Sequence, residues 1–357
     1  MAIHLIDISP EDLRAIQNLL KLGHFESVEQ FVAVAVRNQL VYETQRDSSQ
    51  LTVVEQAIGK AASAAPGNLA RVSDLGTNHR FLPKPSWLFS SPDIEPLPAI
   101  KPTQDPLWGQ YYRFLPLKLI LRLLANAQQD GFPRMDTFQD QIVPDVLYLA
   151  NHLRVTDNTR KQMGRMALAI GFPNTRKAEK SQARFVSQYI GRVTAEGNLA
   201  GLPAAMGFAA LLTDPDVKLL GLTKTGVEFA SLPNPILDNG DLSCALGDEE
   251  ISFLLAHISE QMPGEIAQLK EVVKAVSDGL DTPKELDAHM RNHYKKSFSG
   301  DNWTDAKVAV MRSGAVSRLA EMGFIKVIKK GVRVRYKLAE DWKRRLMQID
   351  GTFLEES

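Results

Sequence analysis

The chain has 357 residues, enough for two to four domains that each bury their own core. It carries 42 basic and 42 acidic residues, so net charge alone neither indicates nor excludes a nucleic-acid partner. The single cysteine, Cys244, excludes an internal disulfide and a cysteine-based zinc site.

The first predicted unit spans residues 1–43. Ile3–Ile8 is a strand-like run, and Ser9–Asp12 begins a helix because serine can cap it and proline fits its first turn. Ser27–Gln30 has the spacing of a capping box that begins a second helix. This order resembles the ribbon-helix-helix family of DNA-binding proteins, in which two chains pair their strands. The resemblance implies a homodimer through this unit.

The paired ribbon of that family usually faces DNA with polar or basic side chains. If the alternate isoleucines face the core, the side toward DNA carries Ile3, Leu5 and Asp7, two apolar residues and one acid. An acid opposite phosphate is unfavourable, although aspartate can accept a hydrogen bond from cytosine. We therefore expect this unit mainly to dimerise the protein, with base reading as the alternative. The amides beside Ser27 are a candidate phosphate site.

Residues 44–107 are predicted to form a linker. Pro83–Pro106 contains seven prolines in 24 residues, a density that excludes a regular helix and favours an extended chain. The apolar run Trp87–Phe89 lies inside this stretch. It could dock on a partner or attach the linker to the body of the protein, and we expect the second.

Residues 108–237 are predicted to form a helical domain. The expected helices are Pro116–Leu124, a helix from Asp136 that is interrupted near Pro144 and continues over Asp145–Val155, Arg160–Ile170, and Lys180–Ile190. The last of these can pack its apolar residues inward, which leaves Arg184, Ser187 and Gln188 outward as candidate DNA contacts. Val217–Phe229 is typical of the last strand and closing helix of a winged-helix protein. The domain is therefore compatible with a second winged helix whose wing is rearranged.

Residues 248–348 are predicted to form the last domain. Helices are expected at 248–260 and 263–278, and a capping box at Thr282–Glu285 begins another that runs to about 295. The next helix has an apolar face, and Gly323 suits its C-terminal end. The residues of that face are Val308, Met311, Ala315, Leu319 and Met322.

A hairpin is predicted after this helix. Val332, Val334, Tyr336 and Leu338 alternate with Arg333, Arg335 and Lys337, so one strand face is expected to be apolar and the other cationic. Lys329–Gly331 is the expected turn to a strand at Phe324–Ile328. From Lys326 to Arg345 the chain carries nine basic residues and two acids.

The order of helices followed by a basic hairpin resembles a winged helix-turn-helix domain. The resemblance implies a recognition helix that presents Ser313 and Ser317 outward, flanked by two arginines, and a wing that offers cations to phosphates. The candidate DNA-binding residues of this domain are Arg312, Ser313, Ser317, Arg318, Lys329, Lys330, Arg333, Arg335 and Lys337.

Motifs for other chemistry were not found. The sequence has no phosphate-binding glycine loop, no dinucleotide fingerprint and no serine-hydrolase elbow. His289 and His293 are four positions apart on a predicted helix, but without an evident third ligand we expect them to lie on a solvated face. We expect no catalytic residues, no cofactor and no metal.

We therefore expect a mainly α protein with small β elements: a ribbon-helix-helix segment followed by one or two winged-helix domains. The predicted function is non-catalytic binding of double-stranded DNA by a dimeric prokaryotic transcriptional regulator. The alternative is a non-catalytic adaptor subunit of a DNA-maintenance or phage-defence complex that uses winged helices for protein contacts. Without a long apolar run or a signal-peptide pattern, we expect a cytoplasmic, nucleoid-associated protein with no membrane contact.

Overall fold

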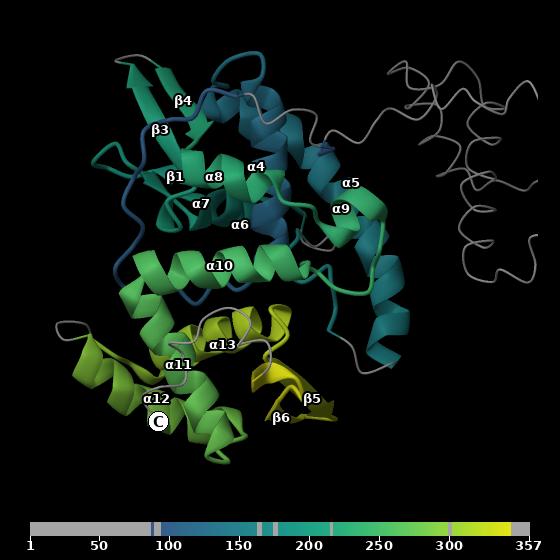
Figure 1. Ribbon diagram of the computed structural model, residues 1–357, viewed down its shortest axis with the longest axis vertical. Coiled ribbons are helices and arrows are strands. Elements are labelled where there is room, and N and C mark those ends of the chain that lie inside the picture. Colours follow the sequence, from purple (N-terminus) through teal and green to yellow (C-terminus); the bar gives the residue numbers. More distant parts are fainter. Residues whose placement is uncertain are drawn as a thin grey trace, which may run out of the picture. The chain divides into compact units, whose positions relative to one another are not determined.

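The computed structural model describes residues 87–88, 94–162, 166–173, 178–214, 217–298 and 302–343. The chain from Pro83 onward forms one compact unit, which in its described part is mainly helical with small antiparallel hairpins (Figure 1). The expectation of a mainly α protein with small β elements is confirmed to that extent. The predicted ribbon-helix-helix segment, including Ser27, lies outside the described residues.

The elements of the first part of this unit include one π-helical segment, η4, that continues α6. In chain order they are α4 (Leu115–Gln128), α5 (Met135–Gln162), α6 (Ala178–Phe185), η4 (Val186–Ile190), β1 (Arg192–Val193), β2 (Leu199–Ala200), α7 (Leu202–Ala205), β3 (Ala209–Asp214), β4 (Val217–Leu222), α8 (Lys224–Ser231) and α9 (Pro235–Asn239).

The second part has four helices and a hairpin. In chain order they are α10 (Asp248–Gln261), α11 (Pro263–Ser277), α12 (Pro283–Ser297), α13 (Asp305–Glu321), β5 (Ile325–Lys330) and β6 (Arg333–Leu338). None of the helices in the described ranges is long and apolar enough to cross a membrane.

The two parts share some of their order of elements. Each has a helix, a loop with one extended residue, two further helical elements and then an antiparallel hairpin. These are α4, α5, α6 with η4, and β3–β4 in the first part, where β1, β2 and α7 intervene before β3, and α11, α12, α13 and β5–β6 in the second. In each part the second strand of the hairpin also bonds the extended residue. Leu220 N donates to Pro133 O over 2.9 Å, and Tyr336 N donates to Asp281 O over 2.7 Å. Both hairpins are thereby fixed to the loop that precedes the second helix.

Several local predictions are confirmed. α4 begins one residue before Pro116, and its fixed φ suits the first turn. At α12 the Thr282 hydroxyl accepts from Glu285 N over 3.4 Å, and the Glu285 carboxylate accepts from Thr282 N over 3.1 Å, which is the predicted capping box. Gly323 has a φ of 81°, a conformation that favours glycine at the end of a helix.

Two predictions on α5 are wrong. The helix continues through Pro144. Pro144 lies on the solvent side, where water can satisfy the carbonyl that the proline leaves unpaired. A helix at Arg160–Ile170 does not form, because α5 ends at Gln162 and the chain turns back on it. The Asp157 carboxylate accepts from Leu168 N over 2.6 Å and from Ala169 N over 2.9 Å, which holds that return.

The described part of the proline-rich linker lies on the body of the protein. Trp87 is buried, and its ring centroid lies 6.1 Å from that of Tyr148. Leu97 N donates to Leu222 O over 2.7 Å, and Thr103 N donates to Ala205 O over 2.9 Å. The prediction that the tryptophan attaches the linker to the body is confirmed.

Candidate nucleic-acid interface

The β5–β6 hairpin has one strongly cationic face. Its register pairs Lys326 with Lys337, Ile328 with Arg335, and Lys330 with Arg333. Because directly paired residues lie on the same face of an antiparallel sheet, these positions form one face. The other face contains Val327 and Tyr336, and Tyr336 is buried against the helices. We call Lys326, Lys330, Arg333, Arg335 and Lys337 the hairpin cations.

The register pairs like charges across the hairpin. Lys326 is directly opposite Lys337, and Lys330 is directly opposite Arg333. Such pairs destabilise a hairpin, typically by a few tenths of a kcal/mol to about 1 kcal/mol. The arrangement weakens the isolated strand pair, but it concentrates positive potential on one narrow surface. An anionic partner would relieve that repulsion.

Only part of this charge is balanced within the chain. Lys326 Nζ lies 3.2 Å from the Glu340 carboxylate, and an Arg335 Nη lies 2.6 Å from Asp281. Both cations are more than half exposed, so water screens these pairs and they contribute little to stability. Within the described ranges, Arg333 and Lys337 are exposed and have no carboxylate partner. Lys329 is also exposed, but it is paired with Val334 on the opposite face.

The predicted turn and apolar face of the hairpin need correction. β5 extends to Lys330, so the turn consists of Gly331 and Val332. Gly331 has a φ of 59°, as a two-residue turn of this kind requires. Val332 therefore belongs to the tip and not to the apolar face, and it is 99% exposed.

Arg312 does not lie on the outer surface of α13, and that prediction is wrong. It is buried, its Nε donates to Asp287 Oδ1 over 2.9 Å, and an Nη donates to the Tyr336 hydroxyl over 2.9 Å. The contact joins α12, α13 and β6. Burial raises the pKa of Tyr336 above its ordinary value, although the nearby Arg312 charge opposes the shift. Arg312 therefore positions the hairpin on the helices.

Arg318 is also internal, and its predicted outward position is wrong. Its side chain is fully buried, its Nε donates to Glu265 Oε1 over 2.8 Å, and an Nη donates to Tyr111 O over 2.6 Å. Glu265 also accepts from Leu107 N over 2.9 Å. The pair thus joins α11 and α13 to the segment before α4.

One side of α13 is covered, because the segment Gly109–Leu115 crosses the helix there. Gly109 and Gly314 touch through their backbones. The Glu321 carboxylate accepts from Phe114 N over 2.5 Å and from Leu115 N over 3.2 Å. The exposed side of α13 is left with small residues, among them Ser313, which is exposed, and Ser317, which is half-buried.

The candidate residues on α6 and η4 differ in exposure. Arg184 is exposed and Ser187 is half-buried, as their predicted outward positions require. Gln188 is not available, because it is buried and its Nε2 donates to Gln110 Oε1 over 2.7 Å. The prediction that Gln188 faces outward is wrong, since the π-helical turn of η4 directs it toward the chain before α4.

The two histidines on α12 are not on a fully solvated face. Glu271 of α11 lies 2.5 Å from His289 Nε2 and 3.9 Å from His293 Nδ1. Burial lowers the pKa of His293, although the Glu271 charge opposes the shift. Across the described ranges, no group of three or more His, Cys, Asp or Glu is arranged to hold a metal ion.

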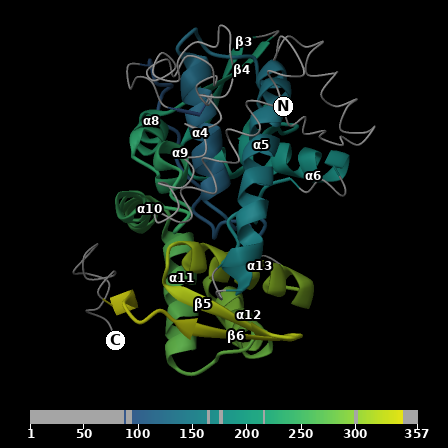
Figure 2. The same cartoon turned by 90° about the vertical axis from the view of Figure 1, so that its right-hand side faces the viewer.

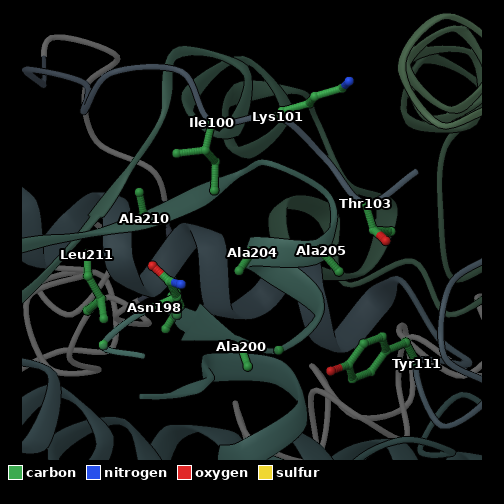
Figure 3. A pocket seen from close by; sticks show the side chains of 13 residues that line it. Ile100, Lys101, Thr103, Tyr111, Asn198, Ala200, Ala204, Ala205, Ala210 and Leu211 are labelled. Atoms are coloured by element: carbon green, nitrogen blue, oxygen red, sulfur yellow. The ribbon is translucent and has the colours of Figure 1, made fainter. Parts of the chain in front are cut away.

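A cleft of about 530 Å³ lies between the linker, the chain before α4, the β1–β2 hairpin, α7 and β3 (Figure 3). Small residues line much of it, and Lys101, Tyr111 and Asn198 supply polar groups. Burial raises the pKa of Tyr111, with the Arg192 charge opposing the shift. The sequence could not indicate this cleft, because its walls come from segments far apart in the chain.

No protein-family model, curated protein or solved structure matches the chain.

Proposed function

We propose that the protein is a non-catalytic DNA-binding protein whose β5–β6 hairpin lies along the phosphate backbone of a duplex. The observation that carries the proposal is the cationic face of the hairpin, where like charges are paired across the strands and the exposed Arg333 and Lys337 have no carboxylate neighbour in the described chain. A duplex carries one negative charge per about 1.7 Å of its axis, so it can neutralise closely spaced cations.

The arrangement of α11, α12, α13 and the hairpin supports a winged-helix domain, with α13 as the recognition helix and β5–β6 as the wing. The partly shared order of elements supports a second, divergent winged helix built on α4, α5, α6 and β3–β4, with β1, β2 and α7 inserted before its hairpin. In this proposal residues 1–43 dimerise the chain, and the protein acts in the cytoplasm as a prokaryotic transcriptional regulator.

The buried arginines change how α13 would act. Ser313 and Ser317 can donate or accept single hydrogen bonds, but Arg312 and Arg318 are engaged inside the protein. Bidentate arginine contacts with guanine are therefore not available from this helix. Contacts to phosphates would dominate the affinity, and we expect duplexes of different sequence to bind with similar strength.

The salt dependence of binding tests the proposal. The logarithm of DNA affinity falls with the logarithm of salt concentration, with a slope of about 0.9 for each phosphate contact in a duplex. We expect the Arg333→Ala, Lys337→Ala double variant to flatten that slope by about 1.8. Its affinity at about 0.1 M salt should fall by between about 10-fold and 100-fold. Fluorescence anisotropy with labelled random duplexes measures both quantities.

A matched control variant distinguishes this effect from a general effect of removing two positive charges at any position. Lys101→Ala with Lys224→Ala also removes two positive charges, from the linker and α8, and should leave affinity and slope unchanged. Equal binding by wild type and the hairpin variant would contradict the proposal. The protein would then be an adaptor whose domains contact proteins of a DNA-maintenance or phage-defence complex.

A further inference from the structure

α6 carries a second cationic patch. Lys180 and Arg184 are both exposed and lie four positions apart, so they occupy one side of the helix. Ser187 continues that side into η4. Neither cation has a carboxylate partner in the described part of the chain, although the exposed Glu179 is adjacent in sequence. We call Lys180, Arg184 and Ser187 the α6 patch.

The chain before α4 connects this patch to α13. Gln110 accepts a hydrogen bond from Gln188 of η4, and Gly109 touches Gly314 of α13. Arg184 is close enough to Tyr112 for its charge to oppose the burial that raises the pKa of that tyrosine. One short segment therefore contacts both η4 and α13.

These contacts also fix the geometry. The carbonyl of Tyr111 accepts from the buried Arg318, and the Glu321 carboxylate accepts from the first residues that lead into α4. Because charged groups buried in such bonds are costly to separate, they fix α13 to the chain before α4, and η4 is held to the same chain through Gln188. The β5–β6 hairpin follows α13 directly and is held on it through Arg312.

α6 and the turn end of the hairpin lie on the same side of the molecule. In Figure 2, α6 and the turn end of the hairpin both point to the right, and α8 lies on the opposite side. In Figure 1, the same two elements recede from the viewer, so the views agree.

We propose that the α6 patch and the hairpin cations contact one and the same DNA duplex. This inference rests on the proposed function and adds that a single chain holds the duplex at two rigidly spaced places. Because the two groups of cations are held in fixed positions, both contribute to a single binding event. No conformational entropy of a flexible linker between them is lost on binding.

The length of the duplex tests the inference. Binding would be measured with duplexes of about 10 and about 30 base pairs, roughly one and three helical turns. The variants are Lys180→Ala with Arg184→Ala, Arg333→Ala with Lys337→Ala, and the control Lys101→Ala with Lys224→Ala. All changed residues are at least partly exposed, and equal melting temperatures would show that each variant is folded.

On the long duplex we expect the α6 variant to bind about 10-fold or more weakly, with a slope lower by up to about 1.8. On the short duplex it should bind like the wild type, because the hairpin alone fills one turn. The hairpin variant should be weaker on both lengths.

Two results would overturn the inference while leaving the proposed function in place. One is an α6 variant that binds the long duplex as tightly as the wild type while the hairpin variant is weakened. The other is an equal loss by the α6 variant on both lengths, which would mean that the patch does not extend the bound tract. Wild-type binding by both variants would instead remove the proposed function itself.

Discussion

We expect the Glu265→Gln variant to unfold with a free energy about 3–5 kcal/mol below that of the wild type. Glu265 and Arg318 are fully buried and are joined by two hydrogen bonds of 2.8 and 3.1 Å. Glutamine keeps the shape and can still accept one bond, but it removes the negative charge. Because arginine does not lose its proton, its charge would stay buried without a counter-charge. Urea unfolding followed by circular dichroism measures the difference.

Two further variants serve as controls for this result. Arg335→Ala breaks the exposed pair with Asp281 and should change the free energy of unfolding by less than about 1 kcal/mol. The Glu265→Leu, Arg318→Met double variant removes both buried charges and should regain much of the lost stability. A Glu265→Gln variant as stable as the wild type would mean that the two side chains do not form a buried pair.

Gly314→Ala is expected to destabilise the protein by about 1–3 kcal/mol. A Cβ at this position would lie 2.6 Å from Gly109 Cα, closer than the 3.0 Å that real Cβ atoms respect. The obstructing atoms belong to the backbone, so no side chain can rotate away. Alanine is otherwise more stable than glycine inside a helix by about 1 kcal/mol. A net loss of stability would therefore come from the steric overlap with the backbone of Gly109. Thermal and urea unfolding both measure it.

Gly247→Ala is the matched control for this substitution. A Cβ there would meet nothing closer than 3.7 Å, and the backbone φ of −78° suits any residue. The change should cost less than about 1 kcal/mol, since Gly247 is only the cap of α10. If Gly314→Ala were as stable as the wild type or more so, the chain before α4 would not lie against α13.

Local signals were sufficient for many of the helices and for the β5–β6 hairpin. Proline at the start of α4 and the Thr282 capping box act within a few residues, so the sequence displays them directly. The alternation of apolar and basic residues likewise marks β6. The turn lies later than predicted, at Gly331 and Val332, because Lys329 and Lys330 could belong equally to the strand or to the loop.

Long-range partners explain the errors on α13. Arg312 and Arg318 flank the apolar stripe of the helix, and an isolated amphipathic helix would turn such residues toward water. Their partners, Asp287 and Glu265, are 25 and 53 residues away in sequence. A pattern read along one helix contains no information about such pairs.

The sequence contains one sign that another segment packs closely against α13. Gly314 stands in the middle of a helix, where glycine costs about 1 kcal/mol relative to alanine and usually has a packing reason. The partner of that contact, Gly109, belongs to a loop more than two hundred residues earlier. The sequence therefore indicated a close contact without indicating its other member.

Photocrosslinking from the hairpin tip tests most directly whether β5–β6 contacts DNA. Val332 is 99% exposed, so p-benzoylphenylalanine can replace it without disturbing the core. The control places the same residue at Lys224 of α8, a helix that lies away from the turn end of the hairpin in Figure 2. We expect a protein–DNA crosslink from position 332 at saturating duplex and none from position 224. Saturated binding without a DNA crosslink from position 332 would contradict it.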